Sequence, residues 1–225
     1  MLLYMANPST AAIRAKMTDG ALGAIMSPAQ GNRLPGAVYC IDNNCGPGKD
    51  GKPGTGYPGD TAYIAYLQNL AQARTTDPCD PEQDLCLFAA APDVLGDAAA
   101  TLDRSCRWFD LIRYVIGLPV ALVAQDGLEH LPVPWDQIDA LFIGGSTQWK
   151  LGPAAAGLVA EANARNKWTH MGRVNTRQRL RYADCIGCDS ADGTGLTRAP
   201  DHNLAQMLRW LDEIRGQLAL FGPRP

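Results

Sequence analysis

The sequence has no apolar run near the roughly 20 residues that a transmembrane helix requires, and its N-terminus has no cleavable signal pattern. Basic residues are not in excess, because 20 Lys and Arg stand against 23 Asp and Glu, for a formal net charge of −3. This balance argues against binding nucleic acid by bulk charge, although a local basic surface can still do so. The seven cysteines are odd in number and irregular in spacing, which disfavours a disulfide framework. We therefore expect a cytoplasmic protein with no membrane partner.

Residues with the sequence spacing of metal ligands are also scarce. The segment CIGC at 185–188 has the spacing of zinc ligands, but a structural zinc takes four ligands and no second Cys pair lies nearby. The three histidines, His130, His170 and His202, show no spacing typical of a metal site or a catalytic triad. The sequence therefore predicts no bound metal and no redox cofactor.

A partial phosphate-binding motif stands in the first third of the chain. The segment GPGKDGK at 46–52 matches the first part of a P-loop, but Pro53 replaces the required Ser or Thr and no helix is expected to begin there. The residues up to 60 are mostly Gly, Pro, Lys and Asp. This composition predicts a mobile loop at about 46–60.

What the sequence does contain is a regular alternation of short apolar segments and helical segments. Eight segments have the length and composition of buried strands, and most are followed by a helix: 2–6, 22–27, 37–41, 85–91, 120–124, 140–143, 168–171 and 185–190. With 225 residues, 46% of them hydrophobic, the chain can build one large core. We predict an α/β fold, a compact single-domain (β/α)8 TIM barrel over residues 1–225. The alternative, an open doubly wound sheet, usually has fewer strands at this length.

Polar residues and glycines stand at or just after the carboxyl ends of these segments. They are Asp42, Asp93, Gln125, Gly144, Gly145, Asp189, Asp192 and, in the following loop, Arg198, with Met171 as an apolar neighbour. In a barrel these ends converge on one opening, where such enzymes place their active sites. An alternative role for Asp93 is to cap the helix that follows it, with no part in the site. Carboxylates, an apolar side chain and a guanidinium together suit a flat polar ligand and an anion, and two separated carboxylates suit nucleophilic and acid–base chemistry at an acetal carbon.

At these residues the chain resembles the tRNA-guanine transglycosylase superfamily. Two downstream motifs carry the resemblance: Met171-Gly172, and Gly187-Cys188-Asp189-Ser190-Ala191-Asp192 followed by Thr197-Arg198 at the same distance as in the family. Upstream, the residues Asp42, Asp93, Gln125 and Gly144-Gly145 occur in the family's order. It implies a (β/α)8 barrel enzyme that replaces a guanine in a polynucleotide with a 7-deazaguanine. It also implies that Asp192 is the nucleophile and Asp42 the general acid/base. Asp93, Gln125 and the Gly144-Gly145 backbone would then bind the base, with Met171 packed on its face.

Three departures from the family pattern narrow the resemblance. The family's Asp-Ser-Gly-Gly-aromatic loop is Asp42-Asn43-Asn44-Cys45-Gly46 here, and no cysteine follows Cys188 to supply the zinc subdomain of the tRNA enzymes. The chain is also much shorter than those enzymes. A barrel without that subdomain is most similar to the DNA 7-deazaguanine transglycosylase (DpdA-type) branch known from bacteria and phages. This implies DNA and a free 7-deazaguanine base as partners.

Three alternatives stay open. The first is the same guanine exchange on tRNA. The second is a barrel enzyme acting on a small phosphorylated metabolite, with Gly193-Thr194-Gly195 and Arg198 as its phosphate site. The third is a nucleic-acid-binding protein without catalytic activity.

Overall fold

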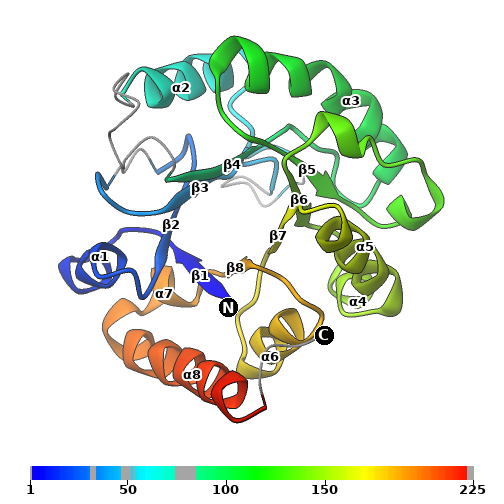
Figure 1. The fold of residues 1–225 in the computed structure, drawn as a ribbon. Helices are drawn as coiled ribbons and strands as arrows, with labels where there is room; N and C mark the ends of the chain where they lie inside the picture. Colours follow the sequence, from blue (N-terminus) through cyan, green and yellow to red (C-terminus); the bar gives the residue numbers. More distant parts are fainter. Residues whose placement is uncertain (1, 31–33, 47–51, 53, 74–84, 222–225) are drawn as a thin grey trace.

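The computed structural model describes residues 2–30, 34–46, 52, 54–73 and 85–221, without the side chains of residues 198, 201 and 217–221. Its strands form a closed, parallel, eight-stranded barrel in sequence order, in which β1 pairs with both β2 and β8 (Figure 1). The predicted (β/α)8 barrel is therefore confirmed. The strands are β1 (Leu3–Ala6), β2 (Gly23–Met26), β3 (Tyr39–Ile41), β4 (Cys86–Ala90), β5 (Val120–Ala124), β6 (Ala140–Ile143), β7 (Trp168–Met171) and β8 (Ser190–Asp192).

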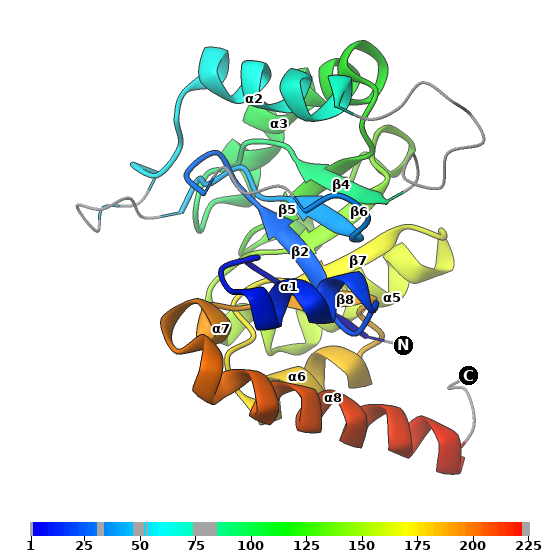
Figure 2. The same cartoon turned by 90° about the vertical axis from the view of Figure 1, so that its left-hand side faces the viewer.

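Helices surround the barrel on its outer side (Figure 1). They are α1 (Ala11–Thr18), α2 (Asp60–Gln72), α3 (Ala98–Asp110), α4 (Thr147–Lys150), α5 (Pro153–Ala164), α6 (Arg177–Cys185), α7 (Gly195–Arg198) and α8 (Pro200–Phe221). Side-chain oxygens fix where four of them begin, because Thr10, Asp97, Ser146 and Thr176 accept backbone N–H groups in the first turns of α1, α3, α4 and α6. The last helix, α8, contacts α1, α6 and α7, and so covers the junction where β8 meets β1 (Figure 2).

Short non-α turns complete the helical layer. The π-helix η1 (Leu111–Ile116) continues α3 and ends at Gly117, whose φ is 82°. The 3₁₀ turns η2 (Leu128–His130) and η3 (Trp135–Gln137) lie between β5 and β6. No helix among the described residues is both long and apolar enough to cross a membrane.

The predicted strand at 185–190 is wrong. Cys185 is the last residue of α6, and the strand begins only at Ser190. The helix ends because Gly187 adopts a φ of 92°, in the left-handed region, while the N–H of Cys188 donates to the carbonyl of Ala183 at 2.9 Å. An apolar-looking stretch was therefore a helix end rather than a strand, and this displaces Asp189 from the predicted end of β8 to its beginning.

Buried residues form two separate groups on the two sides of the strands. A small cluster fills the barrel interior, made of Met5, Cys40, Phe88, Ala90, Ala121, Val123, Ala140 and Phe142. A larger cluster lies between the strands and the helices, and it includes Met171. Because side chains alternate along a strand, the residues of each strand divide between these two groups. The position of a residue in this alternation decides whether it can reach the opening of the barrel.

Candidate active site

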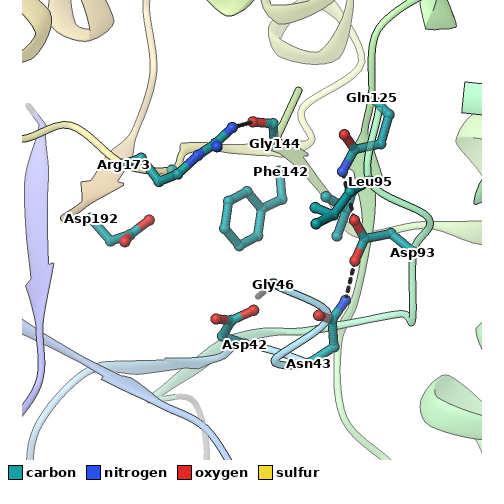
Figure 3. Close-up of a pocket in the computed structure, with 12 residues that line it drawn as sticks. Asp42, Asn43, Gly46, Asp93, Leu95, Gln125, Phe142, Gly144, Arg173 and Asp192 are labelled. Atoms are coloured by element: carbon teal, nitrogen blue, oxygen red, sulfur yellow. Dashed lines mark hydrogen bonds between the residues drawn. The ribbon is translucent and has the colours of Figure 1, made fainter. Parts of the chain in front are cut away.

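A pocket of about 200 Å³ opens at the carboxyl ends of the strands. It is lined by Asp42, Asn43, Gly46, Asp93, Leu95, Val123, Gln125, Phe142, Gly144, Gly172, Arg173 and Asp192. Figure 3 shows the carboxylates of Asp42 and Asp192 on one side of this pocket and Asp93 with Gln125 on the other, with the ring of Phe142 between them. The structure thus brings together five of the predicted site residues: Asp42, Asp93, Gln125, Gly144 and Asp192.

Strand alternation explains why these residues meet. Asp42, Gln125, Gly144, Gly172 and Asp192 each stand two positions after a residue that faces the barrel interior. Side chains at i and i+2 point to the same face of a strand, so the next inward position past the strand end falls at the opening. The pocket is the continuation of the barrel interior, and its polar lining begins where the apolar interior ends.

Asp42 is a carboxyl group that keeps its proton at unusually high pH. Its pKa is raised to about 7, mainly because burial disfavours the charged form, and next because of the nearby charge of Asp192. The backbone N–H of Asn44 donates to the carboxyl at 3.2 Å and partly opposes this rise. A carboxyl that titrates near neutral pH can both give and take a proton, as general acid–base catalysis requires.

Asp93 belongs to a rigid hydrogen-bonded network on the opposite wall. Gln125 Nε2 donates to Asp93 Oδ2 at 2.6 Å, and Asn43 Nδ2 donates to Asp93 Oδ1 at 2.9 Å. The side-chain oxygen of Gln125, Oε1, in turn accepts the backbone N–H of Gly96 at 2.9 Å. Burial raises the pKa of Asp93, and the bonds from Asn43 and Gln125 oppose the rise. Asp93 does not cap α3, since Asp97 does so.

Asp192 is held from below by a buried histidine. His170 Nε2 lies 3.0 Å from Asp192 Oδ1, and His170 Nδ1 lies 2.8 Å from the hydroxyl of Ser190. The Asp192 side chain is 18% exposed and opens to the pocket, whereas that of His170 is 0% exposed. This role of His170 was not predicted from the sequence. Its place two positions after Trp168, on the inward face of β7, was the signal that could have found it.

Two basic residues lie near the pocket. Arg173 lines the rim with an exposed side chain and a φ of 59°, and its guanidinium donates to the carbonyl of Gly144 at 2.6 Å and also to that of Gly145. Lys150, at the end of α4, is buried and donates to the carbonyl of Gly172 at 2.5 Å. Burial first, and the charge of Arg173 second, lower the pKa of Lys150 to about 7. These three hydrogen bonds tie the loop after β7 to the segment after β6.

Met171 and Asp189 do not reach the pocket, contrary to the prediction. Met171 is fully buried in the outer cluster, because it follows the inward-facing His170 and therefore faces the helices. Asp189 stands before β8 rather than after it. Its carboxylate accepts the N–H and the hydroxyl of Thr169, both at 2.8 Å, at the amino end of the strands.

The Gly144-Gly145 turn differs in part from the prediction. Gly144 lines the pocket, but the N–H groups of both glycines donate to the carbonyl of Ala124 at 3.0 Å, so they are engaged within the fold. Gly145 is a packing position, since a Cβ there would lie 2.3 Å from the ring of Trp149. The backbone amides of this turn therefore do not point at a ligand.

Other predicted features lie partly outside the described residues. The side chain of Arg198 is outside them, and so are residues 47–51 and 53 of the predicted mobile loop at 46–60. In the predicted phosphate site, the N–H of Gly195 donates to the side chain of Asn175 at 3.2 Å. Among the residues that the structure describes, no group of three or more His, Cys, Asp or Glu side chains is placed to hold a metal ion.

Comparison with known proteins adds a general likeness of fold. No family model and no curated protein match this chain. Among solved structures, 3-hexulose-6-phosphate synthase from Salmonella typhimurium is 14% identical with a TM-score of 0.49, over 96% of this chain and 99% of that one. A putative glycerophosphoryl diester phosphodiesterase from Agrobacterium tumefaciens str. C58 is 15% identical with a TM-score of 0.39, over 77% of this chain and 60% of that one.

Proposed function

We propose that this protein is a transglycosylase that exchanges a guanine in DNA for a free 7-deazaguanine through a covalent intermediate on Asp192. The observation that carries the proposal is the pairing of two unlike carboxyl groups in one pocket. Asp42 has a pKa of about 7, while Asp192 accepts a hydrogen bond from His170 and faces the same space (Figure 3). Substitution at a glycosidic carbon requires one carboxyl group that acts as general acid/base and a second that acts as nucleophile. Different surroundings give two carboxyl groups these different roles.

The first half of the reaction releases guanine. The Asp192 oxygen that is not bonded to His170 attacks C1′ of the sugar, and an ester bond forms as the bond from C1′ to the base nitrogen breaks. The electron pair of the broken bond leaves with the base, and Asp42 gives its proton to the base. Asp42 is then ionised, and the polynucleotide is attached to Asp192.

The second half reverses these steps with a new base. Asp42 takes the proton from the ring nitrogen of the incoming 7-deazaguanine, whose electron pair then forms the bond to C1′. The ester bond breaks and returns Asp192 to its carboxylate form. Each carboxyl group ends the cycle in the state in which it began, which fits a pKa for Asp42 close to neutral pH.

The far wall of the pocket suits the base. Guanine carries N–H donors on one edge, and the Asp93 carboxyl, which accepts bonds from Asn43 and Gln125, lines the pocket as an acceptor for such donors. Phe142 lines the pocket with an apolar ring, and this replaces the contact that was expected from Met171. The Asn43 and Gln125 amides hold Asp93 in place, and such preorganisation limits the entropic cost of binding.

The size and charge of the opening suit a nucleotide turned out of its helix. A pocket of about 200 Å³ admits a base but no base pair, so the target must be single-stranded or extruded from a duplex. The guanidinium of Arg173 at the rim suits contact with the phosphates that flank such a nucleotide.

A second candidate is an enzyme acting on a small phosphorylated metabolite. The pocket volume and the rim guanidinium of Arg173 favour a small anionic substrate as well. The phosphate would then bind near Arg173, because the N–H of Gly195 is already bonded to Asn175.

Trapping the intermediate separates these candidates. The protein is incubated with guanine-containing single-stranded DNA or with tRNA, without any incoming base, and run on a denaturing gel. We expect an SDS-stable adduct with DNA that maps to residue 192, is absent in Asp192→Ala, and is retained in the neighbouring control Asp189→Ala. An adduct with tRNA alone changes the polymer. Release of guanine without any adduct, or an adduct that persists in Asp192→Ala, contradicts the mechanism. Turnover of phosphorylated sugars in place of guanine release supports the second candidate.

A further inference from the structure

A chain of hydrogen bonds runs through the barrel interior beneath Asp192. The indole N–H of Trp168 donates to the hydroxyl oxygen of Ser190 at 2.8 Å, and that oxygen lies 2.8 Å from His170 Nδ1. The other ring nitrogen, Nε2, lies 3.0 Å from Asp192 Oδ1. Ser190 and His170 are fully buried, Trp168 at one end of the chain is partly buried, and Asp192 at the other end opens to the pocket.

Counting donors along this chain assigns the position of the imidazole proton. An indole nitrogen can only donate, so the Ser190 oxygen accepts from Trp168. The hydroxyl hydrogen of Ser190 then has His170 Nδ1 as its acceptor at 2.8 Å. With Nδ1 as an acceptor, the ring carries its hydrogen on Nε2 and donates it to the Asp192 carboxylate.

Aromatic packing holds the imidazole ring in this orientation. The rings of Phe142 and Phe88 meet it edge to face, with centroid distances of 4.5 and 5.4 Å. These contacts and the Ser190 bond prevent the ring from turning without leaving a buried polar atom unpaired, which costs more than an ordinary hydrogen bond provides.

We propose that His170 is a positioning residue that fixes the Asp192 carboxylate for attack, with Ser190 and Trp168 setting its tautomer. The Nε2–H group occupies Oδ1 and leaves the second oxygen free toward the pocket. It also disperses the negative charge on the carboxylate without transferring a proton to it. The catalytic part of this inference rests on the proposed role of Asp192 as nucleophile, whereas the assignment of the tautomer does not.

The tautomer can be measured without a substrate. In protein labelled with ¹⁵N-histidine, the three histidines are told apart with the variants His170→Gln and His130→Gln. We expect the His170 Nε2 to carry hydrogen and Nδ1 to carry none at neutral pH. A protonated Nδ1 in the folded wild-type protein overturns the assignment. In Ser190→Ala we expect the preference for Nε2–H to weaken, because the donor to Nδ1 is gone.

The catalytic part is tested by the rate at which the Asp192 adduct forms on single-stranded DNA. In His170→Leu the hydrogen bond to the Asp192 carboxylate is lost, and bonds to charged groups stabilise more than bonds between neutral groups. We therefore expect adduct formation to slow roughly 10- to 100-fold, with oligonucleotide affinity nearly unchanged. His170→Gln keeps an N–H donor near the same place and should recover most of the rate. His130→Gln is the matched control, since His130 is 81% exposed.

The possible outcomes separate this inference from the proposed function. Equal rates in wild type and His170→Leu overturn the positioning role while the transglycosylase proposal stands. Equally slow rates in the Leu and Gln variants show a packing role and also overturn it. If wild-type protein forms no adduct with any polynucleotide, the proposed function fails, and the tautomer measurement still decides how His170 holds Asp192.

Discussion

Replacing Asp42 with Asn should make the folded protein more stable at pH 8 and less active. The pKa of Asp42 is about 7 in the folded protein, against an ordinary value of 3.8 for an aspartate. A carboxyl with a raised folded-state pKa binds its proton more tightly in the native state. Stability is therefore greatest below the ordinary value, falls as the pH rises from about 4 to about 7, and stays at the lower level above that.

The size of this effect follows from the difference between the two values. They differ by about three pH units, and each unit corresponds to about 1.4 kcal/mol, so complete ionisation would cost about 4 kcal/mol. Part of the Asp42 carboxyl opens to water in the pocket, and solvent screening reduces the cost. We expect Asp42→Asn, which cannot ionise, to be about 2 kcal/mol more stable than wild type at pH 8 and to show little of this gain at pH 4.

The assay is chemical denaturation of both proteins at pH 4, 6 and 8. Asp103→Asn is the control, because Asp103 is exposed on α3 and its change accounts for general charge effects. Activity should fall by roughly 10²- to 10⁴-fold in Asp42→Asn, and wild-type activity should fall as the pH rises through about 7. A variant that is no more stable than wild type at pH 8 would refute the argument from burial. Undiminished activity would transfer the acid–base role to Asp93.

Two further predictions concern residues outside the proposed chemistry. Gly193→Ala should lose about 1–3 kcal/mol of stability in thermal or urea unfolding, because its Cβ would lie 2.7 Å from both the Tyr4 hydroxyl and the Val174 carbonyl, whereas Gly195→Ala, whose Cβ meets no atom within 4 Å, should be nearly neutral. Equal losses in the two variants would contradict this packing argument. Asp189→Ala should cost about 1–3 kcal/mol of stability through loss of its bonds to Thr169 while adduct formation continues. Loss of the adduct in a stable Asp189→Ala protein would return Asp189 to the site.

Much of the fold could be predicted from the sequence because the strands are short, apolar and separated by clear turn signals. The strands at 120–124, 140–143 and 168–171 have the predicted bounds, and the remaining strands except β8 lie within theirs. The exception is the segment 185–190. Cys185 is the exposed last residue of α6, and the left-handed conformation of Gly187 ends the helix just after it, so the apolar residues at the start of this segment belong to a helix end and not to a strand.

Five predicted residues line the pocket, and four of them also have the inward-facing place in the strand alternation, whereas the fifth, Asp93, lies in the loop after β4, three positions after the inward-facing Ala90. The four are Asp42, Gln125, Gly144 and Asp192. Met171 stands at a strand end but on the outward face. Proximity to a strand end was thus a necessary criterion for these strand residues but not a sufficient one, and counting positions from an inward-facing residue would have excluded Met171.

The supporting residues were harder to predict, because their roles depend on contacts between strands. His170 acts on Asp192 only because β7 and β8 are neighbours in a register that places His170 opposite Ser190. Arg173 reaches the carbonyls of Gly144 and Gly145 through a backbone conformation that a sequence does not reveal for a non-glycine residue. Chemical identity therefore indicates which residues can react, and closure of the barrel decides which residues hold them in position. Each strand of the barrel provides one inward-facing position at the opening, so the opening can carry few reactive groups. The buried residues one layer deeper in the barrel orient these groups, as His170 does for Asp192.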